Sequence, residues 1–493
     1  MSRSNVTVAV GFIDLATYDC VDGYLYGGPC SVTYFVRSVK KANWFSIVPV
    51  SLRTASVPSD LFTTPAGTLI EFQSTLNRSG DYILNVWLRV GLPLIRLAAL
   101  PTSTFADTVG IRYTHNFMHN LVESAEIHFN ELISQTLDSA WFDFNHYFRT
   151  PGSKKVGYDT MIGNVASMYN FVFPLTAAGA VPAAADRTFL GTGGFFDLPL
   201  PFWFTEDSGL ALPIASLPFN DVTIHYTLRA LRDLIVVDVG TAAPAVTRDQ
   251  ILALIVDDAG SSAIGLTNIQ TFAHYAVVHQ DERCMMGTCP RDIVFTQIQW
   301  ISDRAFDPCG TALGSNIYDL KLSHPVMFIA FAARNTTIPG EWSNYAVLDG
   351  DFPSTASGPV NLNGFDPIAH AVVTYENTAR VDMGADYYSL IVPWYWCPAI
   401  PDVSGIHGYS YALRAFGLDP SGSTNYSKLA NVSKDITASA AAAADAVFNC
   451  TGVESDDPDF PLPAVVRSYT FIMRARNWNV HKISGGSIGL PVL

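Results

Sequence analysis

Two histidines and a glutamate lie at a spacing that could bind a metal ion. His115, His119 and Glu123 recur every four residues in the segment THNFMHNLVE. On a helix this spacing puts both imidazoles and the carboxylate on one face, as a zinc site requires. In zinc peptidases, however, the acid lies between the two histidines, and no further clear ligand follows here. We therefore expect both histidines to be structural.

Three other segments carry residue types found at metal and phosphate sites. Cys284 and Cys289 lie near His279, but their spacing matches no strong zinc template and no second cysteine pair follows. The acidic run at 456–459 lacks the glycine and the terminal glutamate of an EF-hand loop. The glycine-rich run at 191–194 has no strand-then-helix context, which a phosphate-binding loop needs. We predict free thiols and solvated loops at these places.

Motifs of nucleophilic, metallopeptidase or nucleotide chemistry do not occur in the sequence. The paired carboxylates of a glycosidase can lie far apart in sequence, but nothing here selects a pair. The sequence therefore predicts no catalytic residue, no cofactor site and no metal site, and we do not expect an enzyme.

The sequence predicts that the elements that would position any site are mainly β-strands. Apolar and polar residues alternate through 222–229 and again through 468–475, as in strands with one buried face. The segment 81–90, DYILNVWLRV, is rich in β-branched and aromatic residues. The stretch 114–144 has a partial helical period, and a short helix and a strand are equally favoured there. Frequent turn signals between short strands predict an all-β chain of sandwiches or jelly rolls, with few short helices in loops.

The run Leu198–Leu228 joins an aromatic strand, a crossing punctuated by proline and glycine, and an alternating strand. It holds no reactive constellation, and we expect it to close the first of two sandwiches. Glu206 and Asp207 within it are better candidates for turn chemistry or a subunit contact than for catalysis. A looser version of the same order of elements occurs at 394–413.

Three alanine-rich segments, 176–185, 240–245 and 438–446, lack core-sized side chains, so we interpret them as loops. The second lies near the midpoint of the 493-residue chain, just after a predicted strand. A chain of this length exceeds what one core usually supports. The predicted parts are an N-terminal arm, a first jelly roll, a linker and a second jelly roll, at residues 1–22, 23–230, 231–250 and 251–493.

Composition narrows the class of partner. Only 15% of the residues are charged, against roughly 25% in typical soluble domains, which favours a subunit whose flanks are buried against neighbours. The net charge of -15 and the absence of a basic run argue against direct nucleic-acid binding. The first residues make a poor signal peptide, so we expect folding in the cytosol. There the seven scattered cysteines stay reduced.

Many segments, in order and from both halves, resemble one protein family. They include GFIDLATYD, YLYGG, SGDYILNVWL, RYTHNFMHNL, GYDTMIGNV, LPLPFWFTEDSGLALPIASLPFND, RNTTIPGEWSNY, MGADYYSL, DPSGSTNYSKLANVS and SGGSIGLPVL, which begin at Gly11, Tyr24, Ser79, Arg112, Gly157, Leu198, Arg334, Met383, Asp419 and Ser484. On these segments the chain resembles the iridovirus-type major capsid proteins of the nucleocytoplasmic large DNA viruses. The segments between 240 and 287 and the alanine-rich pieces depart from the family pattern.

This resemblance implies a double jelly roll, in which two eight-stranded sandwiches stand side by side. It further implies a homotrimer with the outline of a pseudo-hexagonal capsomer, and capsomers that tile an icosahedral shell around a lipid-lined DNA core. Neighbouring capsomers, minor capsid proteins and the internal viral membrane are the partners it implies. The expected location is the virion, after synthesis in the host cytoplasm.

An apolar cluster precedes the first convincing strand. We predict that it is an inner-face anchor of the arm, formed by Phe12, Ile13, Leu15 and Tyr18. The alternative function from another class is a carbohydrate-binding or glycan-cleaving β-sandwich, which would share the high aromatic content. That alternative needs an exposed aromatic platform or a pair of carboxylates.

Overall fold

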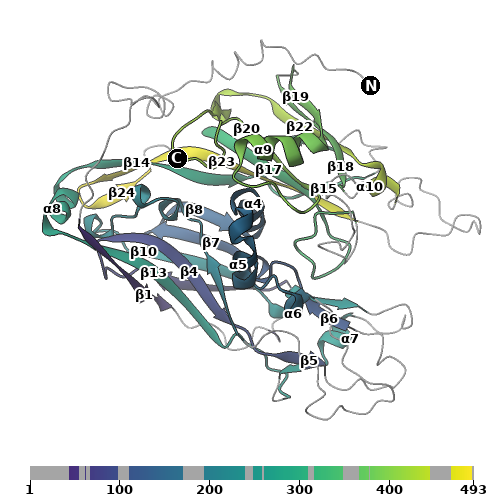
Figure 1. Cartoon of the computed structure of the whole chain (residues 1–493), viewed down its shortest axis with the longest axis horizontal. Helices are drawn as coiled ribbons and strands as arrows, with labels where there is room; N and C mark the ends of the chain where they lie inside the picture. Colours follow the sequence, from purple (N-terminus) through teal and green to yellow (C-terminus); the bar gives the residue numbers. More distant parts are fainter. Residues whose placement is uncertain are drawn as a thin grey trace, which may run out of the picture.

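A computed structural model describes eleven stretches of the chain, at residues 44–54, 62, 67–97, 110–169, 194–238, 248–257, 260–308, 316–347, 366–376, 378–444 and 468–490. The predicted arm and its four apolar side chains lie outside these residues. Antiparallel strands dominate the described chain, and the helices between them are short (Figure 1). None of the helices in these stretches combines the length and the hydropathy needed to cross a bilayer.

Two antiparallel sheets make the first half (Figure 1). One has the order β1-β13-β4-β9, with strands Phe45–Ser51, Asn268–Val278, Tyr82–Gly91 and Phe195–Pro199. The other has the order β2-β3-β10-β7-β8, with strands Arg53–Thr54, Leu69–Thr75, Val222–Arg229, Val122–Phe129 and Leu132–Asp138. Buried and half-buried residues alternate along β10, as predicted. Its inward side chains meet those of the facing sheet, and Tyr226 Oη lies 3.2 Å from Thr271 Oγ1.

Smaller elements surround these sheets. Two short strand pairs are β5 with β12 and β6 with β11, at Ile95–Leu97, Ile255–Asp257, Gly110–Tyr113 and Ile235–Asp238. The α-helices of this half are α3, α4, α5, α6, α7 and α8, at Phe117–Leu121, Ser139–Arg149, Gly152–Ile162, Ala166–Tyr169, Arg248–Leu252 and Gln280–Thr288. Single 3-10 turns are η2, η3, η4 and η5, at Trp203–Thr205, Ser208–Leu210, Ile214–Ser216 and Leu231–Leu234.

The second half also contains two sheets. The larger has the order β14-β23-β17-β20, with strands Arg291–Trp300, Tyr469–Ser484, Pro325–Asn335 and Ile406–Ser410. Short strands β15, β21 and β24 join its edges, at Arg304–Phe306, Thr424–Asn425 and Ser487–Gly489. The smaller has the order β16-β22-β18-β19, with strands Asn316–Asp319, Val432–Ala438, Ile368–Tyr375 and Thr378–Gly384. When strands of only two or three residues are left out, the two large sheets of each half together contain eight strands among the described residues.

The larger sheet of the second half is the middle layer of the molecule and is buried on both faces. Phe328 and Ala330 on β17 belong to the core shared with the first half, whereas Phe331 and Ala333 belong to the core beneath the smaller sheet. This explains why β17 is a nearly continuous apolar run. It also corrects the prediction for 468–475, because both faces of β23 are buried there rather than one.

The predicted linker at 231–250 is wrong, because strand pairing continues beyond it in the first half. β11 pairs with β6, and β13 lies between β1 and β4 in the first sheet. A strand that hydrogen-bonds on both sides belongs to its sheet, whatever its distance along the chain. The first jelly roll therefore extends to Val278, and α8 connects it to β14 at the start of the second.

Several local predictions also change. The stretch 114–144 contains both alternatives, helices α3 and α4 with strands β7 and β8 between them. Residues 203–205 form a 3-10 turn instead of an aromatic strand. At 392–396 the chain forms helix α9, Val392–Trp396, which follows the π-helical turn η6, Tyr387–Ile391. Part of the last alanine-rich segment is helix α10, Ala440–Ala444, because alanine has the highest helix propensity.

Candidate functional site: a polar seam between the two jelly rolls

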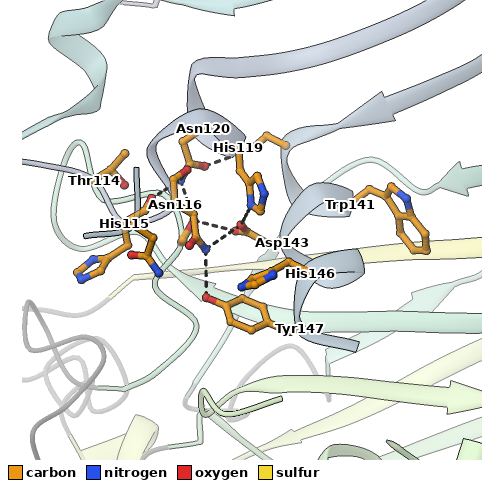
Figure 2. A network of polar contacts seen from close by, with 12 residues as sticks. Thr114, His115, Asn116, His119, Asn120, Trp141, Asp143, His146 and Tyr147 are labelled. Atoms are coloured by element: carbon orange, nitrogen blue, oxygen red, sulfur yellow. Dashed lines mark hydrogen bonds and ion pairs between the residues drawn. The ribbon is translucent and has the colours of Figure 1, made fainter. Parts of the chain in front are cut away.

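Polar side chains from both halves meet in the interior where the jelly rolls join. The first half supplies residues before and within α3 and α4, and the second half supplies the segment that follows β17. We call this set the polar seam, and it comprises Arg112, Thr114, His115, Asn116, His119, Asn120, Asp143, Glu341, Ser343 and Tyr345. All ten are buried. Figure 2 shows how the members from α3 and α4 point toward one another.

Local sequence explains why these side chains converge. Asn116 precedes α3 in the left-handed conformation, with φ of 49°, which asparagine tolerates better than most residues. The chain therefore turns sharply between β6 and α3. In the second half, Glu341, Ser343 and Tyr345 are spaced two apart, and all three reach the seam.

Glu341 lies at one end of the seam. Its Oε2 lies 2.6 Å from Arg112 Nη1 and 3.3 Å from His115 Nδ1, and its Oε1 accepts a hydrogen bond from Thr114 Oγ1 at 3.0 Å. Burial acts to raise the pKa of Glu341, but the charges and hydrogen bonds of His115 and Arg112 outweigh it and lower that pKa to about 2. The carboxylate is thus held in its charged form.

Asp143 on α4 lies at the other end and accepts four hydrogen bonds. Asn116 Nδ2 and His119 Nδ1 lie 2.9 Å and 2.7 Å from its Oδ1. The hydroxyls of Ser343 and Tyr345 donate to its Oδ2 at 2.7 Å and 2.9 Å. Two donors come from each half, so this one carboxylate binds the two jelly rolls together.

The protonation of His119 follows from its surroundings. Burial outweighs the attraction of Asp143 and lowers the pKa of His119, which favours the neutral ring. Asp143 can only accept, so Nδ1 of the neutral ring carries the proton, and Nε2 accepts from the Tyr158 hydroxyl at 2.9 Å. Both ring nitrogens are therefore satisfied by structural partners.

Asn120 connects the two ends. Its Nδ2 donates to the His115 carbonyl at 2.8 Å and to Ser343 Oγ at 2.7 Å, and its Oδ1 accepts from Ser139 at 3.2 Å. The Ser343 hydroxyl thus accepts a hydrogen bond from Asn120 and donates one to Asp143. The seam is not fully satisfied, because Asn116 Oδ1 is buried without a hydrogen-bond partner among the described residues. The hydrogen bonds that cross between the halves nevertheless favour one arrangement of the two jelly rolls.

Charged pairs continue the junction along β23. Arg476 Nη2 lies 2.7 Å from Glu206 Oε2, and the two side chains are only 1% and 8% exposed. Arg474 Nη2 lies 2.6 Å from Asp138 Oδ2. Each pair joins an arginine of the second half to an acid of the first. Breaking a buried pair leaves an unpaired charge, so these pairs oppose any sliding of one half on the other.

The seam is not arranged for nucleophilic catalysis. A catalytic serine needs its hydroxyl beside a histidine base. Here Ser343 donates directly to Asp143, and the free side of His119 is engaged by Tyr158. All of these groups except Tyr158 are fully buried, so no substrate atom reaches them. The arrangement holds two domains in one orientation.

The structure places the residues singled out in the sequence as follows. His115 and His119 both enter the seam but contact different carboxylates, and within the described chain no cluster of histidine, cysteine and carboxylate side chains has metal-binding geometry. Cys284 and Cys289 are exposed free thiols on α8 and at its end. Most of 191–194 and all of 456–459 lie outside the described residues.

The crossing residues have separate roles. Asp207 accepts a hydrogen bond from Gly209 N at 2.9 Å, which is the turn chemistry that the sequence suggested. Glu206 instead pairs with Arg476 inside the chain. Sequence reasoning missed Asp143, Glu341, Ser343 and Tyr345. Their only sequence signal is that polar residues occur within two aromatic segments, SAWFDFNHYF and EWSNY, which lie more than 190 residues apart.

Comparisons with known proteins agree with this architecture. The family described as "Major capsid protein N-terminus" matches residues 33–277, and "Large eukaryotic DNA virus major capsid protein" matches residues 282–489. These ranges meet at α8, where the strand pairing also changes from the first jelly roll to the second.

Curated relatives match along the whole chain. The major capsid protein of Costelytra zealandica iridescent virus is 39% identical and that of Invertebrate iridescent virus 6 is 40% identical, and each match covers 100% of both chains. Among solved structures, a PBCV-1 virus capsid chain has a TM-score of 0.64 at 16% identity, covering 94% of this chain and 100% of that one. The Faustovirus major capsid protein has a TM-score of 0.57 at 14% identity, covering 92% and 93%.

The structural likeness confirms the predicted double jelly roll, and the relatives are structural proteins rather than enzymes. The polar seam holds the two sandwiches in one orientation. The chain therefore belongs to the major capsid protein family of the iridescent viruses and other large eukaryotic DNA viruses.

Proposed function

We propose that three copies of the chain form a pseudo-hexagonal capsomer, and that such capsomers tile the icosahedral shell of a large double-stranded DNA virus. The observation that carries this proposal is the polar seam, which holds two similar eight-stranded sandwiches side by side. Three such subunits around a threefold axis present six similar sandwiches, and a nearly hexagonal outline tiles a surface without large gaps.

Exposed aromatic side chains on α9 are the proposed trimer contact. Trp394 and Tyr395 are 69% and 66% exposed, and Val156 on the neighbouring helix α5 is 79% exposed. Lys155 and Trp394 line the same surface hollow, so the two helices present one surface made from both halves. Aromatic residues are enriched at the centres of protein interfaces. Contacts between neighbouring capsomers are expected to be smaller and weaker, so that misplaced units can detach.

The native mass and outline of the purified chain test this proposal. We expect a mass of about three 53.6 kDa chains and hexagonal particles in negative stain. Replacing both Trp394 and Tyr395 with alanine should shift the mass toward the monomer. Met285→Ala, which removes a side chain 65% exposed on α8, is the matched control and should leave the trimer intact. A monomer at high concentration in the wild type would contradict the proposal.

The N-terminal arm is the proposed contact with the virion interior. We propose that Phe12, Ile13, Leu15 and Tyr18 anchor it against minor capsid proteins or the internal membrane. The net charge of -15 supports shell contacts through protein rather than direct DNA binding. Synthesis in the host cytoplasm is proposed because the family resemblance implies it. Deleting residues 1–19 should spare the trimer and impair shell assembly, so loss of the trimer itself would refute this role.

A further inference from the structure

A groove of about 870 Å³ lies on the outer face of the first jelly roll and takes no part in the polar seam. Its floor is formed by β4, β9 and β13, and its wall by the end of α4 and by α5, which lies beside β9. Figure 1 shows α5 next to this sheet. Ligand sites in proteins usually measure about 300–1,000 Å³. The groove therefore has room for a ligand of two or three sugar rings.

Aromatic rings line the floor of the groove. Trp87 on β4 and Phe272 on β13 are direct cross-strand partners, and their rings are stacked with centroids 5.5 Å apart. The His274 ring lies 4.8 Å from the Trp87 ring. All three side chains are half-buried, so the rings keep accessible surface. Trp87 and His274 line the groove and form its aromatic platform, and Phe272 packs against the Trp87 ring outside the lining.

Hydrogen-bonding groups surround the platform. Arg89 binds Asp197 through two hydrogen bonds, with Nε–Oδ1 and Nη2–Oδ2 distances of 2.7 Å and 3.0 Å, and this pair is held beside the Phe272 ring. The side-chain amides of Asn85 and Asn145 also line the groove. An amide offers both a donor and an acceptor, which matches the dual character of a sugar hydroxyl.

The groove is locally positive in an acidic chain. Its lining holds Arg89, Arg149 and Lys154 but only one carboxylate, Asp197, although the chain carries a net charge of -15. Arg149 pairs with Glu206 at 3.4 Å, but Glu206 also pairs with Arg476 at the shorter distance of 2.7 Å. Arg149 thus shares its carboxylate with a second arginine, and the exposed Lys154 has no carboxylate partner in the lining.

We propose that this groove binds an acidic oligosaccharide. A pyranose ring has one face of C–H groups and a rim of hydroxyls. The C–H face would pack on the negative face of the Trp87 ring, the hydroxyls would bond to Asn85, Asn145 and Asp197, and a sulfate or carboxylate would lie near Lys154 and Arg149. An extended acidic peptide would match the positive charge of the groove. It lacks the flat apolar face and the rim of hydroxyls that would match the Trp87 ring and the amides of Asn85 and Asn145. Glycan binding would add recognition of a cell or virion surface to the shell function.

Binding of defined probes to the full-length chain tests the proposal. The probes are a sulfated trisaccharide, a neutral trisaccharide of similar size and a tri-aspartate peptide. We expect the sulfated sugar to bind at least tenfold more tightly than the neutral sugar and the peptide, and its affinity to fall with added salt. Trp87→Ala should weaken it at least tenfold, and Lys154→Glu at least threefold.

The matched control is Trp44→Ala, which removes a tryptophan that is 87% exposed outside the groove and should leave the affinity unchanged. Thermal melting checks that each variant is folded, and if Trp87→Ala is not, Lys154→Glu and Asn85→Ala carry the test. Absence of sugar binding would overturn the proposal. So would stronger binding of the peptide, or equal binding by the wild type and folded variants of the groove.

Discussion

The polar seam and the core of the second jelly roll are both fully buried, but their ionisable side chains differ in whether they have hydrogen-bond partners. In the seam, the carboxylate of Glu341 meets several donors from the first half, and that of Asp143 meets donors from both halves. In the second core, Lys434 is 0% exposed, and its Nζ has no hydrogen-bond partner among the described residues. Its ammonium position lies 3.1 Å above the Phe331 ring instead.

Buried ionisable groups therefore fix the orientation of the two halves in the seam, whereas in the second core the buried amine only costs stability. A paired charge defines how two surfaces must align, because every misalignment leaves it unsatisfied. A single amine among aromatic rings defines little, since a ring face accepts it from many directions. Changes at four positions, Glu341, Gly405, Lys434 and Asp249, test this contrast.

Removing Glu341 should have the largest effect. Glu341→Leu leaves Arg112 and His115 buried without their carboxylate, so we expect a loss of about 3–5 kcal/mol in the free energy of unfolding. Urea denaturation followed by tryptophan fluorescence measures it. A loss below 1 kcal/mol would mean that the seam does not hold the halves together.

The same carboxylate predicts a pH dependence. The pKa of Glu341 is lowered from its usual 4.5 to about 2 in the folded chain, so its stabilising contribution is complete above about pH 5 and is lost as the pH falls toward 2. The difference in unfolding free energy between wild type and Glu341→Gln should therefore shrink between pH 5 and pH 2. A difference that stays constant over this range would contradict the charged state of Glu341.

Gly405→Ala should disturb the seam from the side of the second half. Gly405 has φ of +87°, and a Cβ there would lie 1.8 Å from the Tyr345 carbonyl oxygen. The Tyr345 backbone would have to move and carry its hydroxyl away from Asp143, with a cost of about 2–3 kcal/mol. Thermal melting measures it. Gly152→Ala, at a position with no neighbouring atom within 4 Å, is the control.

Near pH 9, Lys434→Met should stabilise the chain by about 1–2 kcal/mol, because it removes an amine that burial disfavours in its charged form. Burial lowers the pKa of Lys434 well below 10.5, so the unfolded chain binds the extra proton. Wild-type stability therefore falls as the pH drops below 10.5, and the advantage of the variant should grow by up to about 1.4 kcal/mol per pH unit. An advantage independent of pH between 10 and 8 would contradict a buried neutral amine.

The smallest effect is expected at a surface pair. Arg232 Nη2 lies 3.0 Å from Asp249 Oδ1, and the Asp249 side chain is 78% exposed. Asp249→Ala should change the unfolding free energy by less than about 0.5 kcal/mol in urea denaturation. An effect comparable to that of Glu341→Leu would mean that burial is not what distinguishes the seam.

Local sequence predicted the strands with one buried face well. The alternation in β10 appears in the structure because one face packs inward and the other is partly open to solvent. The same rule failed for β23, whose two faces are covered by different layers. Only the packing of one sheet between two others makes a polar residue such as Arg474 an inside residue.

The domain boundary shows a second limit. A strong loop signal near residue 240 suggested a division, but β13 returns to pair with β1 and β4. Pairing across roughly two hundred residues has no local signature, since hydrogen bonds between backbones do not depend on side-chain identity. The candidate site was recognised only in part for the same reason, with His115 and His119 noticed and their carboxylates missed.

The all-β class and the lack of a reactive motif could be predicted from the amino-acid sequence, because alternation and turn chemistry act over a few neighbouring residues. Its family segments also identified the double jelly roll. The end of the first jelly roll, the sheet in the middle and the charges that hold the halves together became visible only in the folded chain. Those properties depend on contacts between residues 200 or more positions apart, such as Asp143 with Ser343 and Tyr345.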